Sequence, residues 1–577
     1  MRRTIRTLVM TGFALGAATS ALAQEVRGTV RESTSRQPIP GAVIALLDSA
    51  GRTLGRNITD ERGQYRLVVS ASTTQLRFIR IGFRPVTVSL ARSGTRVDTM
   101  NVVMTTLPTM LDPVTVSANG CPRRDDAGPA LGLLEQARAS LLNSVVAREA
   151  NPGRVVRLRF QRMMDGTSDR IARQTVKVDS TARSEAPFTA VRSAAEFVRA
   201  GFVKEELGGT VFYAPDADAL LDDAFMAGYC FRLVRPDREH PTEVGLGFAP
   251  PGRARNRVDI DGVLWVDTTR RQLRRLEFRY VGLDRSLAGA NPGGRLSFRD
   301  MANGVVIIDR WSLRLPSVHD DSLYDNFKQA YAHRISLEAQ ETGGEVAHIE
   351  WPSGLAWGAP LGTLRLTLLT HAHAAATGTR VSLDGTDYSR RADANGEVTI
   401  DRLLPGPYKL VVVDGLLEPL GVTLNTPIAF EAVRDSTHRA TLDVPTADDF
   451  VADRCSHDAI WHDAIPRRRP NAVWMIGRVI GPDDEPISEI SASVSEGSKA
   501  KLARQQSTPF ALAETHNELT STRTGTDGIF ELCQGRFLVG DSVVVAIRHR
   551  DMMTSAFPFA LKDSLTVLPL VREPRRP

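Results

Sequence analysis

Few residues of this 577-residue chain have the types and spacing that catalysis or metal binding needs. His240 and Glu243 have the His-x-x-Glu spacing that can place two ligands on one zinc ion, and His371 and His373 offer two more imidazoles. Pro241 favours a loop at the first pair, and 11 histidines in the chain produce such spacings by chance. We therefore expect no zinc site at these residues.

A second cluster of metal-ligand types is Cys455-Ser456-His457, followed by His462. A disulfide accounts for Cys455 more simply, because the chain carries an export signal and oxidising compartments favour disulfides. The sequence also lacks a Gly-Lys-Ser/Thr phosphate loop, a dinucleotide-binding fingerprint and a Gly-x-Ser-x-Gly nucleophile elbow. These observations predict no catalytic residue, no cofactor site and no metal site, and hence a protein that is not an enzyme.

Two groups of residues have types suited to binding at a surface. Eight arginines lie between positions 253 and 279, and apolar and charged residues alternate over 276–280. A strand with this alternation has one core face and one charged face, so a solvated sheet face is the simpler interpretation. The alternative is a basic patch for an anionic polysaccharide or a lipid head group.

Tryptophans form the second group, since their rings can stack on sugars. Trp265, Trp311, Trp351 and Trp357 are four of the six in the chain. Trp265 and Trp311 lie in expected strands, which favours core positions for both.

The N-terminus has the features of a secretory signal peptide spanning residues 1–23. Arg2, Arg3 and Arg6 precede an apolar run, and Ala21-Leu22-Ala23 supplies a small-residue cleavage pattern. Without these three arginines the formal charge falls from +5 to +2, so the basic pI is no evidence for nucleic-acid binding. No later apolar run reaches the roughly 18 residues that span a bilayer. We expect an exported mature chain, without a membrane span, in the periplasm or associated with the outer membrane.

Four cysteines remain in the expected mature chain: Cys121, Cys230, Cys455 and Cys533. Export favours disulfides, and four cysteines allow three pairings. We favour Cys121 with Cys230 and Cys455 with Cys533, because each bond would then tie one module to its own leading segment.

The stretch from residue 28 to residue 69 has the pattern of a small secreted β-sandwich. The turn Pro38-Ile39-Pro40-Gly41 precedes an apolar run, and Thr59-Asp60-Glu61-Arg62-Gly63 precedes a strand in which Tyr65, Leu67 and Val69 share one face. These motifs resemble the carboxypeptidase regulatory-like domain of bacterial envelope proteins. That resemblance implies a transthyretin-like sandwich, which also occurs in front of TonB-dependent receptors.

The same pattern recurs twice. Residues 364–398 repeat the alternating strand and the Asp-x-x-Gly turn, and 403–412 add a Leu-Pro-Gly-x-Tyr strand typical of the same family. Residues 476–479 and 524–530 restate the opening strand and the turn, and a polar insertion at 495–522 separates the two halves of this copy. Intervals of more than 100 residues indicate separate similar domains rather than a solenoid.

Residues 111–118 resemble the segment that joins such a domain to a TonB box in outer-membrane receptors. Neither a plug domain nor the ten-residue amphipathic strands of an outer-membrane barrel follow. We therefore interpret 111–118 as an extended linker, and we interpret 466–470, with two prolines and three arginines, as a second one.

Between the first two copies the pattern predicts a β-rich region with two helices. An apolar stripe at helical spacing runs through 125–150, and a shorter helix is expected at 216–227. Asn303-Gly304 predicts a hairpin turn, because both residues readily take positive φ angles. We expect a curved antiparallel sheet partly wrapped around a helix, which resembles the half-barrel of bacterial lipoprotein carriers.

Together these patterns predict a mainly β chain with three transthyretin/Ig-like β-sandwich domains and a β-rich α+β middle domain. The expected sandwiches cover 25–110, 361–446 and 471–572, and the middle domain covers 120–355. The function that fits is binding, adhesion or scaffolding in the cell envelope, with an envelope protein or polysaccharide as partner. The alternative is a lipid carrier or hydrolase activity in the middle domain, which requires an open apolar concave face; a packed core there would exclude lipid carriage.

Overall fold

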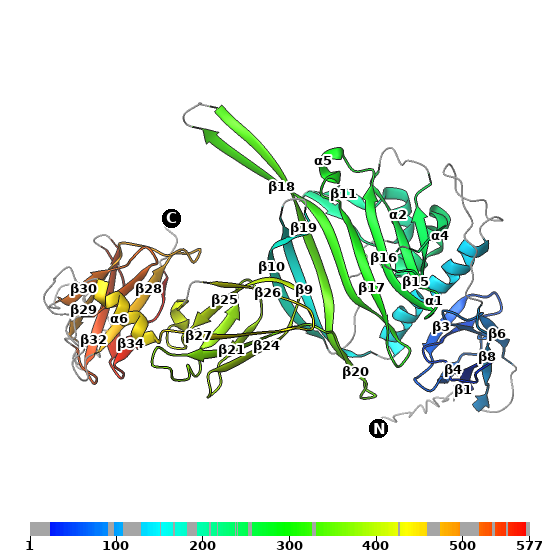
Figure 1. Cartoon of the computed structure of the whole chain (residues 1–577), viewed down its shortest axis with the longest axis horizontal. Coiled ribbons are helices and arrows are strands. Elements are labelled where there is room, and N and C mark those ends of the chain that lie inside the picture. Colours follow the sequence, from blue (N-terminus) through cyan, green and yellow to red (C-terminus); the bar gives the residue numbers. More distant parts are fainter. Residues whose placement is uncertain are drawn as a thin grey trace, which may run out of the picture. The chain divides into compact units, whose positions relative to one another are not determined.

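The computed structural model describes residues 24–90, 97–107, 128–150, 152–165, 168–181, 193–206, 209–215, 217–236, 238, 240–251, 257–325, 330–424, 427–457, 473–496, 518–533, 537–549 and 552–572. The chain forms two compact units (Figure 1). Unit 1 comprises Met1–Arg170 and Asp179–Gly358, and unit 2 comprises Ile171–Val178 and Ala359–Pro577. The signal peptide, the linker segments 111–118 and 466–470, Cys121 and His462 lie outside the described residues.

Unit 1 begins with a β-sandwich. Its strands are β1 (Gln24–Glu32), β2 (Val43–Leu47), β3 (Thr53–Ile58), β4 (Gln64–Val69), β5 (Gln75–Ile79), β6 (Val86–Ser89), β7 (Val97–Thr99) and β8 (Val102–Met104). One sheet has the order β4-β1-β7, with β8 also paired to β1, and the other has the order β3-β2-β5-β6. Alternation in the sequence gives each strand a core face, on which Val26, Tyr65, Leu67 and Phe78 are buried. The predicted sandwich fold is confirmed.

The Asp-x-x-Gly motif forms a turn that its own carboxylate stabilises. The Asp60 carboxylate accepts hydrogen bonds from the backbone N–H groups of Arg62 and Gln64, at 2.9 and 2.8 Å. Gly63 takes a φ of 68°, which side chains disfavour. The second copy repeats this arrangement, since Asp393 accepts from Asn395 and Glu397. A single carboxylate committed to its own turn explains why the motif recurs.

The rest of unit 1 is a large antiparallel sheet with helices. Its helices are α1 (Gly128–Ala150), α2 (Ala194–Ala200), α3 (Ala217–Leu221), α4 (Asp223–Gly228) and α5 (Arg285–Ala288). Its strands are β9 (Arg154–Met164), β11 (Val203–Glu206), β12 (Gly209–Phe212), β13 (Cys230–Val234), β14 (Glu243–Ala249), β15 (Asp259–Asp267), β16 (Gln272–Val281), β17 (Gly293–Asp300), β18 (Val306–Asp325), β19 (Ala330–Glu350) and β20 (Ala356–Gly358). The sheet runs in the order β9-β19-β18-β17-β16-β15-β14-β13, with β20 paired to β19 and with β11 and β12 forming a separate hairpin.

The large sheet curves around α1, as Figure 1 shows. Apolar side chains of α1, α2 and α4 pack against alternate residues of β14 to β18 in one core cluster. Phe197, Phe202, Phe225 and Phe248 are among its fully buried members. The predicted long helix and the Asn303-Gly304 hairpin are confirmed.

The prediction of one shorter helix at 216–227 was wrong in detail. Asp222 has an extended backbone and accepts a hydrogen bond from the Ala224 N–H, so it caps a new helix, α4. The segment therefore forms two short helices, α3 and α4, instead of one.

Strands β18 and β19 are much longer than their neighbours. They pair with each other from Arg310↔Glu345 to Asp325↔Ala330. β17 pairs with β18 only as far as Arg314, and β9 pairs with β19 only from Gln340 to Glu350. The distal part is therefore a two-stranded ribbon that extends beyond the sheet (Figure 1).

Unit 2 contains two further sandwiches and a helix between them. Its elements are β21 (Gly362–Leu369), β22 (Arg380–Leu383), β23 (Ser389–Arg391), β24 (Glu397–Leu403), β25 (Gly406–Val413), η2 (Glu418–Leu420), β26 (Ile428–Ala432), β27 (Thr437–Asp443), α6 (Ala447–His457), β28 (Trp474–Ile480), β29 (Ser491–Glu496), β30 (Glu518–Arg523), β31 (Ile529–Leu532), β32 (Ser542–His549), β33 (Met552–Ala560), β34 (Leu565–Val567) and β35 (Val571–Arg572). The sheets of the second sandwich are β24-β21-β27 and β23-β22-β25-β26. Those of the third are β31-β28-β34, with β35 paired to β28, and β30-β29-β32-β33.

One segment from earlier in the chain also belongs to unit 2. Residues Ile171–Val178 form most of β10 (Ile171–Thr181). Val176 accepts a hydrogen bond from the Asp387 N–H at 2.9 Å, and the Val178 N–H donates to the Asp387 carboxylate at 3.0 Å. The second sandwich is thus extended at residues 386–387 by backbone pairing with this segment.

Candidate binding surfaces

Two turns far apart in sequence meet inside unit 1. The Pro-Gly turn of the first sandwich ends at Gly41 (φ 69°), and the Asn-Gly turn between β17 and β18 ends at Gly304 (φ 77°). A Cβ on Gly41 would lie 1.9 Å from the Gly304 carbonyl oxygen. Only glycines allow this approach. Each turn motif therefore reverses the chain and also forms the contact between the first sandwich and the large sheet.

Asn143 and Arg80 connect the two turns. The Asn143 amide of α1 donates to the carbonyl oxygens of Gly41 and Gly304, and its own oxygen accepts from the Val306 N–H at 2.7 Å. The Arg80 guanidinium donates to both carbonyls as well. Each carbonyl therefore has two side-chain donors, which satisfies buried polar groups that would otherwise be costly.

A buried ion pair completes this junction. Arg80 lies 3.1 Å from the Asp300 carboxylate, and both side chains are largely buried. Burial raises the pKa of Asp300, while the nearby Arg80 guanidinium opposes that shift. Sequence patterns did not identify these residues, although Asn143 stands out as an amide within the apolar stripe of the helix.

Beside this junction lies a polar hollow of about 890 Å³. One wall is the outer face of β1, β4 and β7, and another comes from β3 and the Asp60 turn. Ala150, Asn303, Val305 and Ser353 contribute the side that belongs to the large sheet and α1. Ser353 donates to the Glu61 carboxylate at 3.3 Å across the mouth of the hollow. Its volume is within the range of ordinary small-molecule sites.

The side chains that line the hollow are mostly charged, amide or hydroxyl groups. The Arg66 side chain is paired with Glu25 at 2.8 Å, whereas the Arg27 side chain has no partner among the described residues. Asn303 is buried, and its amide nitrogen has no hydrogen-bond partner in the described part of the chain. Tyr65 is buried beneath this face, and burial raises its pKa to about 12. The hollow therefore suits a polar ligand with several hydrogen-bonding groups.

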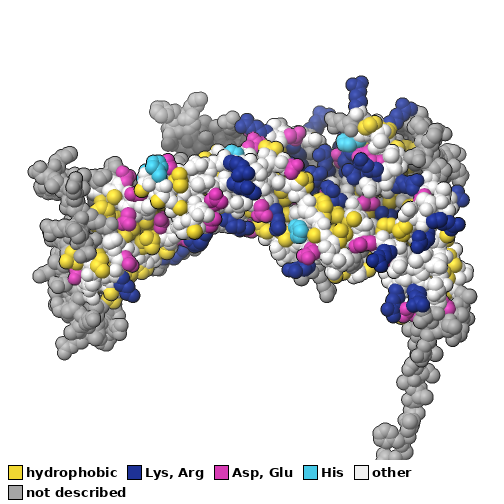
Figure 2. Space-filling model, turned by 60° about the horizontal axis from the view of Figure 1, so that its bottom comes forward, with side chains coloured by type: hydrophobic (Ala, Val, Ile, Leu, Met, Phe, Trp, Pro, Cys, Tyr) yellow, Lys and Arg dark blue, Asp and Glu magenta, His cyan; other side chains and the backbone are white. Residues whose placement is uncertain are grey.

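The arginine-rich segment at 253–279 forms a different kind of surface. Five of its arginines have a carboxylate within 4.0 Å, namely Asp259 for Arg257, Asp267 for Arg270, Glu243 for Arg274 and Arg275, and Asp261 for Arg279. The hydrogen bonds that Arg279 donates to Asp261 raise the pKa of this guanidinium. Figure 2 shows Lys and Arg side chains spread over one face of the chain, with Asp and Glu side chains among them. The paired charges favour a solvated sheet face over a basic patch.

The four tryptophans singled out by sequence do not form an open platform for sugars. Trp265 and Trp351 are buried, and Trp311 and Trp357 are partly buried. Arg275 lies over the Trp265 ring at 4.8 Å, and Arg299 lies over that of Trp357 at 4.5 Å. Guanidinium groups therefore cover two of these rings.

The histidines considered for zinc have other surroundings. The Glu243 carboxylate is paired with the Arg275 guanidinium. His371 lies 3.6 Å from Asp449, a residue that caps α6 by accepting hydrogen bonds from Thr446. Within the described residues no group of three His, Cys, Asp or Glu side chains is arranged to hold a metal ion.

The first sandwich has the sequence of a known domain family. Residues 25–105 match the family model of the carboxypeptidase regulatory-like domain. No curated protein matches the chain. None of the described helices is long and apolar enough to cross a membrane.

Several solved structures have local similarity to the chain, all at very low TM-scores. The TIE protein of Bacillus anthracis is 9% identical over 73% of this chain and 83% of its own, with a TM-score of 0.15. A streptococcal ancillary pilin is 11% identical over 49% and 81%, and the major pilin subunit of Bacillus cereus is 10% identical over 74% and 99%; both have TM-scores of 0.15. Likenesses of this size say nothing about function.

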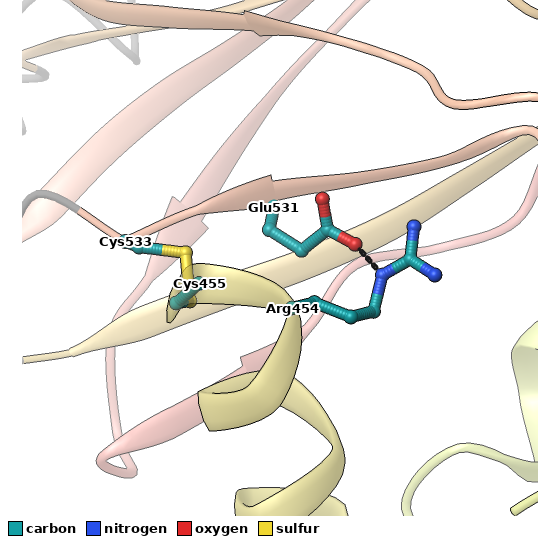
Figure 3. Close-up of a disulfide and its surroundings, with 4 residues drawn as sticks. All are labelled: Arg454, Cys455, Glu531 and Cys533. Atoms are coloured by element: carbon teal, nitrogen blue, oxygen red, sulfur yellow. Dashed lines mark hydrogen bonds and ion pairs between the residues drawn. A yellow bond between two sulfur atoms is a disulfide. The ribbon is translucent and has the colours of Figure 1, made fainter. Parts of the chain in front are cut away.

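The third sandwich has a covered face where the regulatory-like domain has an open one. Val451 of α6 and Leu420 of the second sandwich pack on Ile476 of β28 and Ile529 of β31. Cys455 of α6 is bonded to Cys533, just after β31 (Figure 3).

Polar contacts also hold α6 against the third sandwich. Arg454 donates to Glu531 (Figure 3) and to Asp527. Arg478 of β28 donates to the carbonyl oxygens of Leu420 and Gly421, at 2.9 and 3.1 Å. The helix and the edge of the second sandwich are thus fixed to the third sandwich. The predicted Cys121–Cys230 bond stays a prediction, because Cys121 lies outside the described residues.

Proposed function

We propose that this chain is an exported, non-enzymatic envelope protein that binds or presents a polar ligand, in an adhesive or scaffolding role. The observation that carries the proposal is the polar hollow between the regulatory-like domain and the large sheet. Its walls come from two parts of the chain that the Gly41–Gly304 contact and Arg80 fix together. A preformed site on rigid elements loses little entropy when a ligand binds.

The chemistry of the lining indicates the ligand class. Arg27, Gln64 and Thr99 present charged, amide and hydroxyl groups to the hollow, and the one aromatic residue in its wall, Tyr65, is buried. A saccharide or another polyhydroxylated envelope component fits such a lining better than an apolar molecule. An envelope polysaccharide or glycoprotein is therefore the partner that we propose.

A glycan array with the chain from residue 24 onwards tests this proposal. The variants Arg27→Ala and Gln64→Ala alter the hollow, and Arg56→Ala is a control because Arg56 is exposed and does not line it. We expect retained glycans to bind at least tenfold more weakly to the first two variants and unchanged to the control. Equal binding by all three would show that the hollow is not the site.

Lipid carriage in the middle domain receives no support from its described residues. The face of the sheet that an acyl chain would need is packed against α1, α2 and α4, with Phe248 and Phe225 in T-shaped contact at 5.6 Å. Opening this face would expose fully buried aromatic side chains, which is costly. We therefore prefer the binding role.

The location and the wider system are also proposals. The signal-peptide pattern and the regulatory-like domain support export to the periplasm or the outer membrane, and the segment 111–118 motivates a link to TonB-dependent or glycan-uptake systems. Cell fractionation and cross-linking of the chain in its own cells test both. Recovery in the cytoplasm would contradict the location, and cross-linking without any such receptor would contradict the link.

A further inference from the structure

The three sandwiches can be compared residue by residue through their strand registers. Gly28 pairs with Tyr65, Leu366 pairs with Val398, and Gly477 pairs with Phe530. These pairs are equivalent, so Arg27, Arg365 and Ile476 occupy one position on the outer face of the first strand in each copy. The outer face around this position can therefore be compared directly.

In the third sandwich this face is an interface. Ile476 and Ile529 are buried under α6 and the segment around Leu420. The contact shows that this sheet of the module can serve as a docking surface. In the second sandwich the equivalent residues are polar and exposed, and they line a hollow of about 470 Å³.

Two rows of paired residues, each running across β24, β21 and β27, line the hollow on the second sandwich; each row is called a rung below. Arg365 on β21 lies between Thr399 and Arg439, and Thr367 lies between Glu397 and Thr441. Neighbouring strands are about 4.8 Å apart, and residues two positions along a strand are separated by about 6.6 Å. One rung therefore presents two adjacent guanidinium groups, and the next presents two hydroxyls and one carboxylate.

The two arginines lack counter-charges of their own. The side chains of Arg365 and Arg439 form no hydrogen bond and no ion pair among the described residues. Like charges on directly neighbouring strand positions destabilise a sheet. By contrast, in the regulatory-like domain the equivalent rung contains Arg66, which Glu25 neutralises. The two guanidinium groups on the second sandwich are therefore available to pair with an anion from outside the chain.

We propose that the outer face of β24-β21-β27 binds an anionic polysaccharide, with one carboxylate or sulfate between Arg365 and Arg439. The flanking threonine hydroxyls would donate and accept hydrogen bonds with neutral hydroxyls of the next sugar, and the Glu397 carboxylate would accept them. Glu397 repels a uniformly charged chain such as polyphosphate, and the outward-facing lining offers no large apolar side chain for a lipid surface or a protein core. This site lies in unit 2 and does not depend on the hollow of unit 1.

The test uses the chain from residue 24 onwards, in a background carrying Arg27→Gln so that the regulatory-like domain does not contribute. The site variant is Arg365→Gln with Arg439→Gln. The matched control is Arg390→Gln with Lys409→Gln, which removes the same charge from exposed positions of the other sheet. Binding to immobilised polygalacturonate, dextran sulfate, neutral dextran and phosphatidylglycerol vesicles is measured at two salt concentrations. The thermal unfolding curve of each variant shows that it folds.

We expect polygalacturonate or dextran sulfate to bind the background chain and the control equally, with weaker binding at higher salt. The site variant should bind at least tenfold more weakly, and neutral dextran should not be retained. Unchanged binding by the site variant, or an equal loss in the control, would overturn the site. No binding of either acidic polymer, or binding of the vesicles alone, would overturn the ligand class.

Discussion

Gly41 and Gly304 contact each other through their backbones, although 262 residues lie between them in the sequence. A Cβ on Gly304 would lie 2.4 Å from the Pro40 carbonyl carbon and 2.5 Å from the Gly41 nitrogen. The contact fixes the regulatory-like domain to the large sheet of unit 1. It also makes the junction sensitive to the addition of one methyl group.

Replacement of Gly41 by alanine should loosen this junction strongly. The positive φ alone costs about 1–2 kcal/mol for a residue with a Cβ, and the clash with the Gly304 oxygen adds to that cost. We expect a total near 3–5 kcal/mol, the range of severe substitutions. Hydrogen exchange of the backbone at 38–42 and 301–306 measures it.

Gly51→Ala is the matched control for the clash. Gly51 has a φ of 77°, but no atom lies within 4 Å of the position of its Cβ. It should therefore show only the backbone cost. Equal effects of the two substitutions on exchange at 301–306 would contradict a steric role for the contact.

Asn143→Ala should also weaken the junction. It removes a donor from two carbonyl oxygens and an acceptor from the Val306 N–H. Unpaired buried groups cost about 1–3 kcal/mol each, and Arg80 still serves both carbonyls, so we expect about 2–3 kcal/mol. Ser144→Ala is the control, because among the described residues this buried hydroxyl donates only within its own helix, to Leu141. Denaturant unfolding of the two variants, followed with limited proteolysis between the two parts of unit 1, checks the difference.

Tyr65 should make the regulatory-like domain sensitive to high pH. Its hydroxyl donates to the Met100 carbonyl at 2.7 Å, and burial raises its pKa from 10.0 to about 12. Between these values the unfolded side chain loses its proton and the folded one keeps it, so stability falls as the pH rises. Tyr65→Phe removes the hydrogen bond, worth about 1 kcal/mol, and also removes this dependence.

The stability difference between wild type and Tyr65→Phe is therefore expected to shrink above pH 10 and then reverse. Unfolding midpoints at pH 8, 10 and 11.5 provide the measurement. Burial also raises the pKa values of Tyr229 and Tyr280, but both residues are present in each protein. A constant difference across this range would contradict the assigned pKa of Tyr65.

Loss of the Cys455–Cys533 disulfide should destabilise the third sandwich. The bond closes a loop with a sequence separation of 78 residues, for which chain entropy predicts about 4 kcal/mol. The double variant Cys455→Ser with Cys533→Ser should keep α6 docked through Val451 and Arg454, but with faster hydrogen exchange. Mass spectrometry of non-reduced peptides checks this bond and the predicted Cys121–Cys230 bond together. Free thiols at these positions would contradict both pairings.

Local patterns in the sequence were sufficient for the sandwich fold. Alternation placed Tyr65 and Leu67 in the core. The turns at 59–63, 392–396 and 524–528 located the start of the following strand in each copy, although Gly525 replaces the Asp in the third. These features depend on neighbouring residues and on φ angles, which a sequence displays directly. The helix α6 was missed because it has only 11 residues and a small apolar side, although Thr446 and Asp449 form a cap at its start. Its position depends on packing against Ile476 and Ile529, which are distant in sequence.

The binding surfaces could not be predicted in the same way. The hollow of unit 1 depends on the contact between two turns. Each turn motif predicts its own turn, but neither predicts that the two lie against each other. Some arginines at 253–279 have carboxylate partners on other strands, such as Asp261 for Arg279, and only the strand register brings those pairs together. Arg365 and Arg439, 74 positions apart, became neighbours through a parallel pairing that no local signal specifies.

The Cys455–Cys533 bond has a mechanical consequence for a chain under tension. If the chain is pulled from its two ends, the force passes from α6 to the end of β31 through two sulfur atoms. The 78-residue span between them then cannot lengthen; at about 3.4 Å per residue this removes about 260 Å from the extension of the unfolded chain. Strands β28 to β31 are therefore shielded from tension. In a reducing environment the disulfide would break, and the span could then extend by this length.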